Sequence, residues 1–182
     1  ADSLNMGLKV ACGDWVARLD ADDVCEPFRL ETQISAVRSN SKIVFLGSGL
    51  TIIDENSKAL ARYSYPVQHS GLLANLTLAR KFPPHSSAFF NRDVAISIGG
   101  YRKVLKRAQD CDLWLRLAEK GELASICEPL VRIRKHEGQI SHDSNGMRQY
   151  IDARMAIVAY FVRKAGGEDP IKSDFLIEII HI

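Results

Sequence analysis

Residues 15–23 read WVARLDADD, a short apolar run that ends in three carboxylates within four positions. Apolar residues followed at once by acidic ones are typical of a strand that delivers polar side chains to its carboxyl edge. The carboxylates of Asp20, Asp22 and Asp23 repel one another, and a hard divalent cation such as Mg²⁺ or Mn²⁺ relieves that repulsion. The stretch therefore predicts a metal-binding strand end, with a solvated acidic turn as the plainer alternative.

Two other acidic motifs share part of this pattern. An EF-hand would use Asp20, Asp22 and Glu31 at loop positions 1, 3 and 12, but its sixth position needs glycine and is Cys25 here. A haloacid-dehalogenase-like phosphatase also has an acid pair after a strand, and Asp20 would be its nucleophile. Such an enzyme needs further metal-binding acids at another strand end, whereas the later acids of this sequence begin a helix. The phosphatase stays open as an alternative.

The sequence around the acidic stretch alternates between helical and strand-like patterns. Helices are expected at 3–12, 27–40, 69–81, 92–98, 110–120 and 146–165, and strands at 43–53, 59–63, 123–127 and 130–134. The turn-rich DENS between the first two of these strands predicts a hairpin, and Gly99-Gly100 is expected to end the helix at 92–98. This order predicts one α/β domain with a mixed sheet flanked by helices.

The helix expected at 27–40 is indicated by the spacing of its apolar residues. Phe28, Leu30, Ile34 and Val37 recur at that spacing until Asn40 ends the segment. This recurrence predicts a helix, with Pro27 suited to its first turn.

Composition limits the partners. A formal net charge of +2 over 182 residues excludes the broad basic field of nucleic-acid-binding proteins, although RKVLKR at 102–107 could meet phosphate or lipid headgroups. The four cysteines form no CxxC pair, which indicates reduced thiols, and no stretch reaches the roughly 18 apolar residues of a membrane span. We expect a cytoplasmic protein without a transmembrane segment, with peripheral contact to the inner face of the membrane as an option.

A second acidic centre begins the helix QDCDLWLRL. Asp110 lies close to Trp114 in sequence and could act as a general base in a cleft. In the plainer interpretation Asp110 caps the helix and Asp112 pairs with Arg116 at i,i+4. Further along, His136 lies in the polar loop RKHEGQISH, where an imidazole could join a metal or contact phosphate.

Taken in order, these motifs resemble the family 2 inverting glycosyltransferases of GT-A fold, which use nucleotide-diphosphate sugars. The resemblance covers roughly residues 4–142. Its motifs are LN-GL at 4–8, ARLDADD with the following Pro27, Arg29 and Leu30, then His85-Ser86-Ser87, Gly99-Gly100-Tyr101, QDCDLWLRL and RKHEGQIS.

The resemblance implies a role for each matching residue. Asp22 and Asp20, with His136, would hold the divalent cation, while Asp23, Arg134 and His136 would complete the donor site. Asp110 would be the catalytic base, although Gln109 stands where the family usually has glutamate. The residues implied to shape the acceptor-side cleft are His85, Ser86, Ser87, Gly99, Gly100, Tyr101, Asp112 and Trp114.

The implied activity is transfer of a sugar to a hydroxyl of a saccharide or lipid-linked acceptor, in polysaccharide or glycolipid assembly. Residues 1–145 would be the catalytic, acceptor-side part of the GT-A domain, and 146–182 a C-terminal helical extension. Family members begin with α/β units that hold the nucleotide base, and this sequence starts after them, so we expect an N-terminally truncated domain that self-associates along the strand at 15–19. A noncatalytic binding module is the alternative that Gln109 favours.

Overall fold

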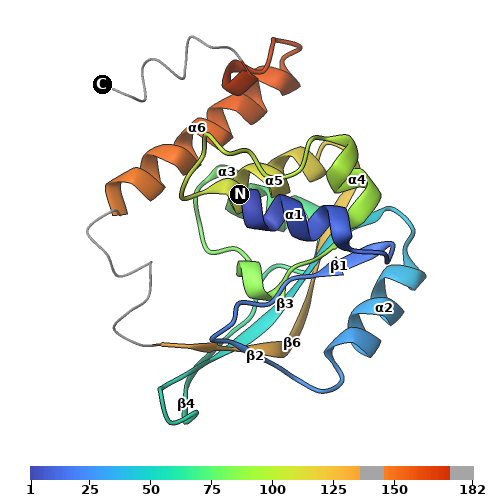
Figure 1. Ribbon diagram of the computed structural model, residues 1–182, viewed down its shortest axis with the longest axis vertical. Helices are drawn as coiled ribbons and strands as arrows, with labels where there is room; N and C mark the ends of the chain where they lie inside the picture. Colours follow the sequence, from blue (N-terminus) through green and yellow to red (C-terminus); the bar gives the residue numbers. More distant parts are fainter. Residues whose placement is uncertain (136–145, 173–182) are drawn as a thin grey trace.

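The computed structural model describes residues 1–135 and 146–172, which form a curled mixed sheet with helices against it (Figure 1). The strands are β1 (Trp15–Ala17), β2 (Val24–Cys25), β3 (Ile43–Ile53), β4 (Ala59–Tyr63), β5 (Phe89–Asn91) and β6 (Glu122–Arg134). The helices are α1 (Asp2–Val10), α2 (Arg29–Ser39), α3 (His69–Thr77), α4 (Arg92–Ser97), α5 (Gln109–Leu117) and α6 (Gly146–Lys164), with 3-10 turns η1 (His85–Ser87) and η3 (Pro170–Lys172). The expected α/β fold with a mixed sheet is confirmed.

Strand β3 is the centre of the sheet, whose order is β1-β5-β3-β6-β2. Its sequence, IVFLGSGLTII, is buried along almost its whole length, as expected for a strand covered on both sides. It pairs in parallel with β6 and antiparallel with β5 and β4, and the pairing with β4 confirms the hairpin predicted around DENS.

Strand β6 differs from the expectation of two short strands at 123–127 and 130–134, because one strand runs through both. Pro129 cannot donate a ladder hydrogen bond, and the pairing shifts register where it faces Gly49 of β3. A Cβ at Gly49 would lie 2.5 Å from the carbonyl oxygen of Cys127, so only glycine allows the two backbones to approach this closely. The strand therefore continues past its proline as a bulge.

Helices cover both faces of the sheet. On one face, α1, α3, α4, α5 and α6 enclose a core in which the Trp114 ring contacts Phe45 of β3 and Phe90 of β5, with centroids 4.5 and 5.3 Å apart. On the other face, α2 covers a smaller core. Helix α6 lies beyond the boundary expected at residue 145, and it contributes Ala156 and Tyr160 to the same large core as α5.

The apolar residues that indicated helix α2 do not mark its buried side, except at Val37. Phe28, Leu30 and Ile34 are 44%, 52% and 37% exposed, whereas Arg29 and Gln33 are buried. Helical spacing identifies apolar side chains, but here a buried arginine and glutamine make the inward contacts through hydrogen bonds.

Strand β1 is an edge of the sheet. It pairs antiparallel with β5, and no strand pairs with its other side within the part of the chain that the structure describes. Self-association along this edge stays a prediction. In the same described ranges, no helix is both long and apolar enough to cross a bilayer.

Candidate active site

The acidic loop crosses the sheet from one edge to the other. Strands β1 and β2 are the two ends of the strand order, and residues 18–23 connect them. At the start of the loop, the amide of Arg18 donates to the carbonyl of Ala88 at 2.8 Å, which extends the pairing of β1 beyond its last residue. The loop therefore passes directly over η1, the turn that leads into β5.

Ser86 of η1 fastens the acidic loop. Its hydroxyl donates to Oδ2 of Asp20 at 2.8 Å and lies 2.5 Å from Oδ2 of Asp23, while the amide of Asp20 donates to the same hydroxyl at 3.2 Å. These contacts join residues more than sixty positions apart in sequence. The predicted serine of the cleft thus positions the carboxylates of the loop.

The three carboxylates of the loop have different surroundings. Asp23 is partly buried and accepts from the amide of Arg134 at 3.0 Å; burial raises its pKa, and the negative charges of Asp22 and Asp20 act in the same direction. Asp20 forms an ion pair with Arg18 and keeps 43% of its side chain exposed, and Asp22 is exposed. Asp23 therefore supports the loop, and the other two carboxylates are the more exposed ones.

Arg29 of α2 supports the acidic loop through hydrogen bonds to backbone carbonyls. Its guanidinium donates to the carbonyls of Arg18 at 2.9 Å and Ala88 at 3.2 Å and, through Nε, to Oε1 of Gln33 at 3.0 Å. Gln33 in turn donates to the carbonyl of Ser87 at 3.1 Å. Two polar side chains of α2 thus hold both the acidic loop and η1, a role that sequence reasoning missed because it read α2 by its apolar spacing.

His85 lies between the two acidic centres. Its Nε2 is 2.8 Å from the Tyr101 hydroxyl, and its ring meets Trp114 edge-on at 5.9 Å. Burial lowers the pKa of His85, and the negative charges of Asp110 and Asp20 act in the opposite direction. The neighbouring Ser86 bonds Asp20 of the acidic loop, and Trp114 lines a pocket together with Asp110. The structure therefore brings the acidic loop and the start of α5 together at this end of the sheet.

Asp110 occupies the first turn of α5, at the side of a pocket of about 230 Å³. Its carboxylate accepts from the amide of Cys111 at 2.8 Å, and Ala108 is the N-cap residue, so the alternative in which Asp110 caps the helix is wrong. Phe82, Trp114 and other apolar side chains line most of the pocket. A partly exposed carboxylate beside such a pocket is suited to accept a proton from a bound hydroxyl.

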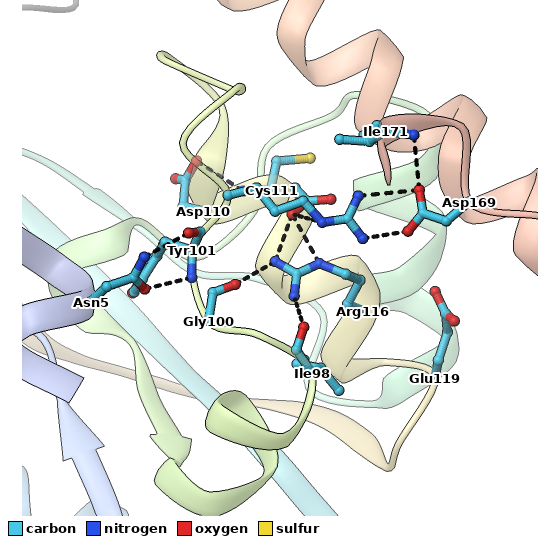
Figure 2. Close-up of polar contacts among 12 residues, drawn as sticks. Asn5, Ile98, Gly100, Tyr101, Asp110, Cys111, Arg116, Glu119, Asp169 and Ile171 are labelled. Atoms are coloured by element: carbon cyan, nitrogen blue, oxygen red, sulfur yellow. Dashed lines mark hydrogen bonds and ion pairs between the residues drawn. The ribbon is translucent and has the colours of Figure 1, made fainter. Parts of the chain in front are cut away.

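Asp112 does not face this pocket. Residues two positions apart on a helix point to nearly opposite sides, and Asp112 is fully buried behind α5, where it accepts from Nε of Arg116 at 2.9 Å. The predicted i,i+4 pair with Arg116 is confirmed, and the expectation that Asp112 lines the cleft is not met. Figure 2 shows this network, which continues through Arg102 to Asp169.

Asn5 of α1 holds the backbone of Tyr101, which explains the asparagine of the LN-GL motif. Its amide donates to the carbonyl of Tyr101 and accepts from the amide of Tyr101, both at 2.8 Å (Figure 2). Gly99 and Gly100 have φ values of 87° and 64°, which lie in the left-handed region that favours glycine, and they end α4 as predicted. Both glycines shape the turn that presents Tyr101.

The remaining predicted site residues are placed as follows. Arg134 joins the β3–β4 turn to the acidic loop: its guanidinium donates to the carbonyl of Asp54 at 3.0 Å and the hydroxyl of Ser57 at 3.1 Å, and its Nε donates to the carbonyl of Asp22 at 3.2 Å. Ser87 is buried and donates to the carbonyl of Pro84 at 2.9 Å. His136 lies outside the described residues, so its predicted role stays a prediction.

The donor set of the acidic loop fits a hard cation that keeps open positions. No group of three or more His, Cys, Asp or Glu side chains stands ready to hold a metal among the residues described. Magnesium-type ions typically use one or two protein carboxylates and take their other oxygens from water and substrate phosphates. Asp22 and Asp20 could supply those one or two carboxylates.

Comparison with known proteins decides the family. The family described as glycosyltransferase-like family 2 matches residues 1–165, which is most of the chain. The chain belongs to glycosyltransferase family 2. Among its relatives is the amylovoran biosynthesis glycosyltransferase AmsE of Erwinia amylovora, 32% identical over 133 residues that cover 72% of this chain and 49% of AmsE. The O-antigen biosynthesis glycosyltransferase WbnJ of Escherichia coli is 33% identical over 102 residues, 56% of this chain and 39% of WbnJ.

The fold of this family 2 chain agrees with a solved structure. TarS 1–349 of S. aureus superposes with a TM-score of 0.53 at 11% sequence identity, over 87% of this chain and 50% of TarS. The predicted GT-A-type fold is confirmed. The chain spans about half the length, or less, of the two relatives named here. Because both are glycosyltransferases, the phosphatase alternative is not favoured.

Proposed function

We propose that this family 2 glycosyltransferase chain transfers a sugar from a nucleotide-diphosphate donor to an acceptor hydroxyl, with inversion at the anomeric carbon. The acceptor is a saccharide or a lipid-linked saccharide of a surface polysaccharide or glycolipid, and the reaction takes place on the cytoplasmic side of the membrane. The names of AmsE and WbnJ, which refer to amylovoran and O-antigen biosynthesis, support this class of product.

One observation carries the proposal. The acidic loop and Asp110 are ninety positions apart in sequence, yet η1 connects them: Ser86 bonds Asp20, and the neighbouring His85 contacts Trp114, which lines the same pocket as Asp110. An inverting transfer needs one group at the leaving diphosphate and another at the attacking hydroxyl on the opposite face of the sugar. The chain supplies a carboxylate for each of these tasks.

Asp110 acts as the general base in this proposal. A hydroxyl bound in the adjoining pocket donates its proton to the carboxylate as its oxygen attacks the anomeric carbon, and the bond to the diphosphate breaks on the far side. The configuration inverts because this is a single displacement. His85 and Tyr101, whose Nε2 and hydroxyl oxygen are 2.8 Å apart, add polar side chains next to Trp114.

Asp22 and Asp20 would hold the divalent cation, Mg²⁺ or Mn²⁺. When bound, such a cation neutralises negative charge that develops on the leaving diphosphate. Ser86 keeps Asp20 in place for this role, and Asp23 anchors the loop through the amide of Arg134. His136 is the further ligand that the family resemblance suggests.

The test is sugar-nucleotide turnover by the whole protein that carries this chain, measured as released nucleoside diphosphate over a panel of donors. Asp110→Asn should lower turnover by roughly 10²–10⁴-fold, the usual contribution of a positioned acid or base. Asp93→Asn is the matched control, since Asp93 is an exposed acid that pairs with its neighbour Arg92. Its turnover should equal that of the unmodified protein.

The same assay separates the other features of the proposal. Chelation should abolish turnover, Mg²⁺ or Mn²⁺ should restore it, and Asp22→Asn should raise the cation concentration that is needed. A product with retained anomeric configuration would exclude the single displacement. Turnover that is unaffected by Asp110→Asn would exclude the assigned base, and the absence of turnover with every donor would favour the noncatalytic module that Gln109 suggests.

A further inference from the structure

Helix α6 is apolar on two opposite sides. One side packs in the main core through Ala156, Ala159 and Tyr160. The opposite side, here named the outer stripe, consists of exposed apolar residues at helical spacing. They are Met147, Tyr150, Ile151, Val158 and Phe161, which are 70%, 55%, 43%, 58% and 55% exposed. A helix that is apolar all round is normally covered on all sides, and nothing within residues 1–135 and 146–172 covers the outer stripe.

The charged side chains that border the outer stripe are all basic. Arg154 and Lys164 lie along or beside it, and the guanidinium of Arg154 sits over the ring of Tyr150 at 5.0 Å, whereas Arg148 pairs with Asp152 at 3.0 Å. The only acid of α6, Asp152, is fully buried and faces inward. The exposed side of this helix therefore combines apolar surface with the positive charges of Arg154 and Lys164.

A second basic segment lies beside α6. The amide of Arg107 donates to Oδ2 of Asp152 at 3.0 Å, which fixes the loop 102–107, RKVLKR, against the helix (Figure 1). Lys106 of this loop is exposed. The basic cluster that the sequence showed thus lies against α6 on the side of Asp152, and two of its residues pair with acids, Arg102 with Asp169 and Lys103 with Asp2.

We infer that the outer stripe of α6 docks on an anionic lipid bilayer. The apolar side chains enter the boundary between headgroups and acyl chains, as in helices that lie in the membrane plane, and the basic residues meet acidic headgroups. From Met147 to Phe161 the stripe is about 21 Å long at the rise of an α-helix. A second copy of the chain fits less well, because two such stripes would oppose basic residues to basic residues.

Docking has a consequence for the neighbouring pocket. Ala153 and Ile157 of α6 line the pocket beside Asp110. A chain that lies on the bilayer along its outer stripe therefore holds this pocket close to the membrane surface. The docking itself does not depend on the proposed transfer reaction.

The test is flotation of the protein with phosphatidylcholine vesicles, compared with vesicles of equal parts phosphatidylcholine and phosphatidylglycerol. The protein should float with the anionic vesicles, less with the neutral ones, and less again as salt is raised. Phe161→Gln should weaken binding to anionic vesicles about tenfold, the effect expected for withdrawing a large apolar side chain from the membrane. Arg154→Gln should weaken it several-fold and reduce the salt dependence.

Leu60→Gln is the matched control, because Leu60 of β4 is 55% exposed, as Phe161 is, but lies away from α6. The Leu60 variant should bind vesicles like the unmodified protein. All three variants should have the melting temperature of the unmodified protein. Equal flotation of the Phe161 and Leu60 variants would overturn the inference, as would equal binding to neutral and anionic vesicles. Absence of flotation, together with a dimer in light scattering that Phe161→Gln dissociates, would assign the stripe to a second copy instead.

Discussion

Asn5→Ala should destabilise the protein far more than its position near the N-terminus suggests. The side-chain amide forms two hydrogen bonds of 2.8 Å with the backbone of Tyr101, which is only 3% exposed. Removing a partner from a buried polar group costs about 1–3 kcal/mol, because that group is left without a hydrogen bond. With two such groups at about 1.5 kcal/mol each, the free energy of unfolding should fall by about 3 kcal/mol.

For a protein of this size, about 3 kcal/mol corresponds to a melting temperature lower by roughly 6–12 °C. Circular dichroism on heating and urea titration measure both quantities. The control is Asn75→Ala, since Asn75 donates one exposed hydrogen bond to the carbonyl of Lys81 at 2.8 Å and its loss should cost less than about 1 kcal/mol. Equal losses of unfolding free energy for the two variants would refute the argument that the Asn5 amide satisfies buried backbone groups of Tyr101.

Three further predictions concern the core of the site. Burial lowers the pKa of His85 in the folded protein, so the unfolded chain binds a proton more readily. The free energy of unfolding should therefore decline as pH falls from the ordinary pKa of 6.5 toward the lower folded pKa. His85→Gln should remove this pH dependence in urea titrations. Gly100→Ala should lower the melting temperature more than Gly99→Ala: both positions have positive φ, but only at Gly100 would the new methyl group meet an α1 amide oxygen, at 2.6 Å. Arg116→Met should cost about 3–5 kcal/mol in urea titrations because it removes both hydrogen bonds to a buried carboxylate, which keeps only the longer contact with Arg102 at 3.5 Å. Arg132→Met breaks a more exposed pair and should cost less than about 1 kcal/mol; similar losses for both would contradict this account.

Local signals in the sequence predicted much of the fold. The hairpin of 43–53 and 59–63 has its observed bounds, because two apolar strands flank a turn whose residues favour that geometry. The end of α4 at Gly99-Gly100 followed from the positive φ that glycine tolerates. Such features depend on neighbours in sequence, so the sequence alone indicates them.

Features that depend on distant contacts were harder to predict. The inward side of α2 is set by Arg29, whose hydrogen bonds reach backbone carbonyls elsewhere in the fold, and apolar spacing cannot reveal such partners. Arg134 ends a strand, as predicted, but its direction depends on the β3–β4 turn beside it. For the candidate site, the acidic residues were identified from sequence, whereas the contact of Ser86 with Asp20 and Asp23 required the folded sheet.

The path of the acidic loop across the sheet also constrains the order of folding. Strands β1 and β2 are near neighbours in the chain, yet β1 pairs with β5 at 89–91 and β2 pairs with β6 at 131–132. During synthesis the ribosome releases the acidic loop long before either partner strand exists. Its carboxylates can therefore stay hydrated and apart while β3 and its hairpin form. They come together only when β1 pairs with β5 and β2 pairs with β6. Pairing over such distances in sequence is slow, so the loop should be among the last parts to reach its native contacts.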